Sequence, residues 1–163
     1  MADEWVVNAS PLIALYAVSH EHLLAQLAVR FVVPESVIDE LMGALDSDRA
    51  FDAGQAGALP IVSDPAPAAE VVRARLGPGE TAVLSFAMEN PGWTAIMDDR
   101  AARRCAHSLG IPVKGVIGIA IMAQQRGIIP SAKELLLAVK GAGLFLDDRL
   151  IAGSLQAAFG EEW

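Results

Sequence analysis

The sequence has 163 residues, of which 53% are hydrophobic and 20% are charged, and its net charge is −8. The length predicts one well-packed domain over residues 1–163, and the apolar content excludes an intrinsically disordered chain. The acidic balance argues against broad electrostatic attraction to nucleic acid, because phosphate binding relies on Lys and Arg. A nucleic-acid substrate would therefore require a local positive charge, such as a bound divalent metal or a basic patch.

Three features of the sequence favour a soluble cytoplasmic protein that does not enter a membrane. The longest apolar runs, such as residues 116–123, are too short to span a bilayer. The acidic amino terminus lacks the basic start of a signal peptide. The single cysteine, Cys105, cannot form an intrachain disulfide, which fits a reducing compartment.

Short apolar runs alternate with longer segments of helical period, and this pattern of βαβ units predicts a mostly parallel sheet covered by helices. In chain order the predicted elements are a strand at 5–7, a helix from 11 to 16, a helix at 23–28, a strand at 31–33, a helix from 35 to 41, a strand at 59–62, a helix from 78 to 89, a strand at 94–97, a helix from 100 to 109, a strand near 113, a helix ending at 127, and helices near 131–140 and 148–159. Ser10 is expected to cap the first helix, because it precedes Pro11. Gly110 is expected to end its helix in the left-handed conformation, and Asp147 to cap the last helix.

Polar side chains stand near the carboxyl ends of the predicted strands, where parallel sheets bind their ligands. These residues are Asn8 and Ser10 after the first strand, Glu40 in the helix after the second, Glu80 in the opening turn of a later helix, and Asp98 and Asp99 after the fourth strand. Carboxylates that are brought together repel unless a cation neutralises them, and hard oxygen ligands suit Mg²⁺ or Mn²⁺. The pattern therefore predicts a metal site that activates water and stabilises charge on a phosphodiester.

Each of these acids also has a purely structural interpretation. Glu40 could lie on a solvated helix face, and Glu80 could simply favour the positive end of a helix dipole. Asp98 and Asp99 could cap the helix that follows them.

Three arginines follow the Asp98–Asp99 pair at helical spacing. Any of Arg100, Arg103 and Arg104 could bind RNA phosphate. Arg100 and Arg103, together with Ser10, are the candidates for substrate binding. The alternative is a solvated helix face whose arginines pair with neighbouring acids.

Several segments resemble the motifs of one known family. Residues 6–15 resemble the opening motif of PIN domains, and more closely that of a bacterial and archaeal branch related to VapC-type toxins. Residues 33–41 resemble the second motif of this branch, residues 76–82 its Gly-Glu-Ala motif, residues 96–103 its Asp-Asp-Arg motif, and residues 110–115 the segment that follows. The motifs occur in family order and cover roughly residues 5–130, which leaves the helices of 131–163 as an extension.

The resemblance implies a three-layer α/β/α sandwich, a Mg²⁺- or Mn²⁺-dependent ribonuclease, and a toxin–antitoxin setting with a small antitoxin partner and a homodimer. It implies that Glu40, Glu80 and Asp99 are the catalytic metal-site acids, with Asp98 adjoining them and Ser10 lining the site. The chain departs from the family at the end of the first strand, where most PIN domains have Asp and this sequence has Asn8. An Asn offers a carbonyl oxygen, but it removes one negative charge from the ion's ligands.

Three functions are compatible with these patterns. The leading hypothesis is a metal-dependent endoribonuclease of toxin type. The alternative is a catalytically weak or inactive PIN-fold module that binds RNA or a protein, which Asn8 and the net charge favour. A phosphatase or receiver domain on another α/β fold is disfavoured, because those chemistries need an acid where Asn8 stands.

Overall fold

A five-stranded parallel sheet lies at the centre of the computed structural model, which describes residues 3–44 and 58–163. Its strands are β1 (Glu4–Val7), β2 (Arg30–Pro34), β3 (Ile61–Val62), β4 (Thr94–Ile96) and β5 (Val113–Lys114). They are arranged in the order β3-β2-β1-β4-β5, so that β1 is the central strand. Trp5 of β1 pairs with Phe31 of β2 on one side and with Thr94 of β4 on the other. The carboxyl ends of the strands therefore meet at one edge of the sheet.

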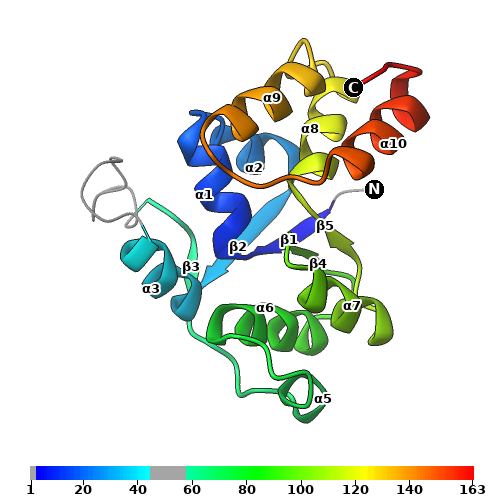
Figure 1. Ribbon diagram of the computed structural model, residues 1–163. Coiled ribbons are helices and arrows are strands. Elements are labelled where there is room, and N and C mark those ends of the chain that lie inside the picture. Colours follow the sequence, from blue (N-terminus) through cyan, green and yellow to red (C-terminus); the bar gives the residue numbers. More distant parts are fainter. Residues whose placement is uncertain (1–2, 45–57) are drawn as a thin grey trace.

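Helices cover both faces of the sheet, as the sandwich architecture requires (Figure 1). The helices are α1 (Ala9–Ala17), α2 (His22–Leu27), α3 (Glu35–Ala44), α5 (Ala69–Val72), α6 (Pro78–Glu89), α7 (Arg100–Ser108), α8 (Val116–Gln125), α9 (Ala132–Gly141) and α10 (Asp148–Phe159). Figure 1 shows α1, α2, α8, α9 and α10 on one side and α5, α6 and α7 on the other. The predicted α/β/α fold with a parallel sheet is thus confirmed.

The core lies against both faces of the central strand. Trp5, Val6 and Val7 of β1 are all fully buried, which explains why this strand is continuously apolar rather than alternating. Leu12 of α1 and Leu84 of α6 are also fully buried. The chain then turns directly from β1 into α1, and this turn fixes Asn8 at the edge where the strands end.

Two capping predictions are confirmed and one is wrong. Gly110 has a φ of +69°, and Asp147 caps α10 by accepting hydrogen bonds from the backbone N–H groups of Arg149 and Leu150. Ser10 does not cap α1, because the helix begins at Ala9 with Asn8 in the capping position. Proline fits anywhere in a first turn, where backbone N–H groups need no intrahelical partner, so Pro11 does not fix the starting residue.

Two further observations concern the short helix α5 and the lengths of the helices. The four-residue helix α5 was not predicted, because so short a segment shows no helical period. No helix in residues 3–44 or 58–163 is long and apolar enough to cross a membrane.

Candidate metal and nucleic-acid site

Asn8 holds a buried polar group at the end of the central strand. Its backbone N–H donates to the carbonyl oxygen of Ile96 at 2.9 Å, which ties the ends of β1 and β4 together. Its side chain is only 1% exposed, and its Nδ2 donates to Oε1 of Glu80 at 3.4 Å. Its Oδ1 is buried and has no hydrogen-bond partner. Such an orphaned acceptor costs about 1–3 kcal/mol and leaves an amide oxygen free to bind a ligand; among the described residues, Nε1 of Trp5 and Oε2 of Glu21 are also buried without a partner.

Glu40 and Glu80 lie beside each other near this amide. Oε1 of Glu40, from α3, accepts a hydrogen bond at 3.0 Å from the backbone N–H of Gly79 in the first turn of α6. A side chain at Gly79 would interfere, because its Cβ would lie 2.6 Å from Oε1 of Glu40. Burial raises the pKa of Glu40, the Gly79 N–H opposes this rise, and the negative charge of Glu80 adds to it. The two carboxylates are therefore held close enough to repel.

The three side chains together suit a hard divalent cation. Asn8 offers an unpartnered amide oxygen, while Glu40 and Glu80 offer carboxylate oxygens whose mutual repulsion a cation would relieve. The start of α6 adds a favourable position for negative charge. On these observations the residues fit Mg²⁺ or Mn²⁺.

Asp98 lies at the same edge but is directed towards α8. Its Oδ1 accepts a hydrogen bond at 3.0 Å from the backbone N–H of Val116. Burial raises the pKa of Asp98, although the Val116 N–H and the nearby Arg103 guanidinium both counteract that rise. Arg103 is held in place because its Nη1 donates to the carbonyl oxygen of Met97 at 3.1 Å. A Cβ at Gly115 would overlap Oδ1 of Asp98, so the approach depends on this glycine.

Asp99 caps α7, and its side chain is exposed. Its Oδ2 accepts a hydrogen bond at 2.9 Å from the backbone N–H of Ala102. The capping interpretation of Asp99 is therefore confirmed, and it does not preclude a second role for the exposed carboxylate. Ser10, in the first turn of α1, is exposed nearby.

The predicted ligands fall into two neighbouring groups. Asn8, Glu40 and Glu80 form the first, while Asp98 and Asp99 form the second with Ser10 and the arginines. Among the residues that the structure describes, no three His, Cys, Asp or Glu side chains lie close enough to hold a metal ion. A single site made from all the predicted acids remains a prediction.

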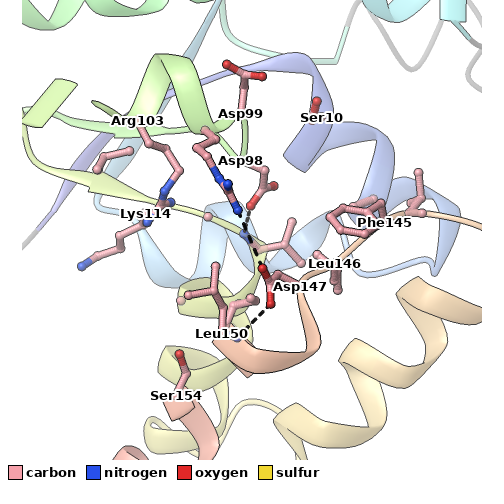
Figure 2. A pocket seen from close by; sticks show the side chains of 18 of the residues that line it. Ser10, Asp98, Asp99, Arg103, Lys114, Phe145, Leu146, Asp147, Leu150 and Ser154 are labelled. Atoms are coloured by element: carbon pink, nitrogen blue, oxygen red, sulfur yellow. Dashed lines mark hydrogen bonds and ion pairs between the residues drawn. The ribbon is translucent and has the colours of Figure 1, made fainter. Parts of the chain in front are cut away.

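A pocket of about 840 Å³ opens from the second group (Figure 2). Ser10, Asp98 and Asp99 line it at the sheet edge, and residues from α1, α7, β5, α8, α9 and α10 and from the segment before α10 complete it. Nη2 of Arg100 lies 3.9 Å from Oδ2 of Asp147 across this pocket. The predicted substrate-binding residues Ser10, Arg100 and Arg103 thus line one cavity.

The sequence is similar to one family over nearly its whole length. The model of the family DUF3368, described as a PIN domain, matches residues 4–160. The chain belongs to the PIN-domain family. This family includes many nucleases, and its members typically use divalent metal ions.

Other comparisons add less about this PIN domain. No curated protein matches it in sequence. Among solved structures it is similar to the crystal structure of PAE2754 from Pyrobaculum aerophilum, with 18% sequence identity and a TM-score of 0.48. That similarity covers 86% of this chain and 92% of the other. It is too distant to support a statement about function.

Several residues of the pocket in this PIN domain were not predicted from its sequence. Lys114, Phe145, Leu150 and Ser154 all line it. Lys114 lies in a segment that resembles a family motif, so its neighbourhood was indicated. Phe145 belongs to no motif and stands between two leucines, so no signal in the sequence identifies it as an exposed aromatic.

Proposed function

We propose that this PIN domain is a metal-dependent endoribonuclease that hydrolyses RNA phosphodiesters. The observation that carries the proposal is the buried, unpartnered Oδ1 of Asn8 beside Glu40 and Glu80 at the end of the central strand. Asn8, Glu40 and Glu80 would hold the Mg²⁺ or Mn²⁺. A bound ion would supply positive charge to the phosphodiester and make water a stronger nucleophile.

The remaining residues would orient these ligands and receive the RNA. The backbone N–H of Gly79 holds the carboxylate of Glu40 in one orientation. Asp98 and Asp99, at the neighbouring strand end, would complete the acidic site that holds the ion. Ser10, Arg100 and Arg103 contact the RNA from the pocket, where the arginines balance part of the chain's negative charge.

The test is cleavage of structured RNAs by purified protein with Mn²⁺ or Mg²⁺, with EDTA as the metal-free condition. We expect Glu80→Gln to abolish cleavage, because it removes one ligand charge. Glu89→Gln is the matched control, since Glu89 is exposed at the far end of the same helix. Equal cleavage by the wild type and Glu80→Gln would point to a contaminating nuclease and refute the site.

The second candidate is a PIN-fold module that binds RNA or a protein and does not cleave. It is favoured by the hydrogen bond from Asn8 Nδ2 to Glu80 Oε1, which partly satisfies one carboxylate without a cation. Wild-type protein that binds RNA in Mn²⁺ but leaves it intact would support this candidate against the first.

We also infer a toxin-like role related to the VapC-type branch, within a single cytoplasmic domain. The inference is supported by the resemblance of residues 6–15 and 33–41 to the motifs of that branch. The partners would be a small antitoxin and a second copy of the chain. Arrested growth on expression, relieved by a small protein encoded beside the gene, would support it. Growth unaffected by active protein would refute it.

A further inference from the structure

The pocket beside Asp98 and Asp99 is richer in positive charge than the rest of the chain. Its lining includes four permanently cationic side chains (Arg100, Arg103, Arg104 and Lys114) and three aspartates (Asp98, Asp99 and Asp147). Over the whole sequence, by contrast, 12 Lys and Arg residues face 20 Asp and Glu residues. This cavity is therefore a place where the acidic molecule could receive an anion.

Two of these cations are available for a ligand. Arg103 donates to the Met97 carbonyl oxygen and faces Asp98, and Arg100 lies near Asp147. Within the described ranges, the side chains of Arg104 and Lys114 form no ion pair or hydrogen bond. Arg104 is exposed and Lys114 is partly buried, so both can contact an anion without first breaking another bond.

An exposed aromatic side chain lies on the opposite flank of the same pocket. Phe145 is 91% exposed, and of the large exposed hydrophobic residues in the described chain it is the only aromatic one. Leu144 and Leu146 on either side of it pack against the core, which turns Phe145 outward. Figure 2 shows Phe145 and Lys114 on opposite flanks, with Ser10 and Asp99 at one end and Ser154 at the other.

We propose that this pocket binds a nucleotide of single-stranded RNA, with its base against Phe145 and its phosphates at Arg104 and Lys114. The proposal rests on the proposed function and adds Phe145, Arg104 and Lys114 as residues that hold the RNA within this pocket. A single strand presents a charged backbone and flat bases, which match a cationic flank and an aromatic flank. The volume of about 840 Å³ falls within the range of roughly 300–1,000 Å³ of small-ligand pockets.

RNA is favoured over a protein partner by the position and charge of the pocket. The unpaired cations and the aromatic ring share one cavity with Asp98 and Asp99, at the edge where the RNA would be cut. A duplex fits less well, because its bases are stacked inside the helix and cannot reach Phe145.

The experiment measures the affinity of labelled RNA by fluorescence anisotropy in EDTA, so that binding does not depend on cleavage. The probes are a single-stranded oligonucleotide, the same strand with abasic sites, and its duplex. We expect Phe145→Ala to weaken binding of the intact single strand about tenfold, Phe145→Tyr to restore it, and the abasic strand to be insensitive to both. Leu137→Ala is the control, since Leu137 is 50% exposed on α9 but does not line the pocket.

The phosphate contacts are tested by the salt dependence of the same binding. Arg104→Ala and Lys114→Ala should each lower the slope of log affinity against log salt by about 0.7. Arg73→Ala removes an exposed cation outside the pocket and should leave the slope unchanged. Because Arg104 and Arg73 are exposed and Lys114 is only partly buried, thermal unfolding should report an intact fold in each variant.

Several results would overturn the proposal. These are absent binding of the single strand, unchanged affinity in Phe145→Ala, or equal affinity for intact and abasic strands. A loss of self-association in Phe145→Ala with unchanged RNA affinity would assign the surface to a protein contact instead. Phe145-dependent binding in EDTA without cleavage in Mn²⁺ would support this proposal and refute the nuclease, whereas cleavage with no effect of Phe145 would do the reverse.

Discussion

Asn8 serves three parts of the molecule at once. Its backbone N–H closes the junction of β1 and β4, its position starts α1, and its amide reaches Glu80. An aspartate could fill the first two roles but could not donate to Glu80. Compared with an aspartate, the amide therefore lowers the repulsion among the acids when metal is absent. It also carries one negative charge fewer, so it attracts a cation less strongly.

Asn8→Asp should lower the stability of the metal-free protein and raise its affinity for a divalent metal. In EDTA we expect a loss of about 1–3 kcal/mol, because a buried carboxylate would face Glu80 without a donor. Mn²⁺ should bind more tightly and restore the melting temperature. Denaturation in EDTA and calorimetric titration with Mn²⁺ measure the two effects. Unchanged values in both would show that Asn8 does not belong to the metal site.

Gly79→Ala should damage the site while preserving the fold. The added Cβ would displace the carboxylate of Glu40 from the Gly79 N–H, and loss of such an orienting bond typically lowers metal affinity 10–100-fold. The lost hydrogen bond should cost about 0.5–1.5 kcal/mol of stability, partly offset because Ala favours the helix more than Gly does. Gly153→Ala in α10 is the control, since nothing lies within 4 Å of its added Cβ. Equal Mn²⁺ affinity in both variants would contradict the role of Gly79.

At the scale of elements, the turn from β5 into α8 determines where Asp98 can lie. The absence of a side chain at Gly115 lets Oδ1 of Asp98 reach the Val116 N–H, and Arg103 closes over the same place. A glycine of ordinary backbone conformation is therefore required here for space alone.

Gly115→Ala should destabilise the protein by about 1–3 kcal/mol. The added Cβ would force Asp98 away from Val116, and the buried N–H of Val116 would be left without an acceptor. Gly118→Ala offers a comparison within α8, since its added Cβ would lie 3.7 Å from the nearest atom. That change should stabilise by up to about 1 kcal/mol. Chemical denaturation gives both values, and hydrogen exchange at Val116 reports the lost bond. Similar stabilities for the two variants would refute the steric argument.

Elements with a strong local signal could be predicted from the sequence. The helix Pro78–Glu89 begins with proline and carries a clear apolar pattern, and β1 is a short apolar run. The proximity of Asn8 to Glu80 followed from the rule that parallel strands end at one edge. The direction of Asp98 towards α8 could not be predicted, because it depends on how Gly115 packs. The pocket around Phe145 depends on how α10 packs in the folded protein, and no periodic pattern in the sequence indicates it.

At the scale of the whole molecule, one carboxylate joins the last helices to the end of the chain. Asp148 at the start of α10 pairs with Lys140 of α9 and accepts a hydrogen bond from Nε1 of Trp163 at 2.7 Å. Nζ of Lys140 also lies 5.5 Å from the centroid of the Trp163 ring. These contacts close the outer helical layer that forms part of the pocket wall.

This contact should make stability depend on pH. Hydrogen bonds from Lys140 and then Trp163 lower the pKa of Asp148, so its contribution is present at neutral pH and is lost as pH falls through the lowered pKa. Asp148→Asn should therefore melt below the wild type at neutral pH; this difference should start to shrink as pH falls below the ordinary aspartate value of about 3.9 and should vanish only below the lowered pKa. Melting curves at both pH values test it. A constant difference would show that the charge is irrelevant.

The central place of β1 sets the order in which a newly made chain can assemble. Trp5 can pair with Phe31 soon after both leave the ribosome, but its other edge waits for Thr94. Until then the N–H of Asn8 has no Ile96 carbonyl to bind, and Asp98, which follows β4, cannot be fixed relative to it. Because such distant pairing is slow to form, the acidic edge is completed only late in synthesis. A partly made chain would therefore lack the acidic edge on which the proposed nuclease activity depends.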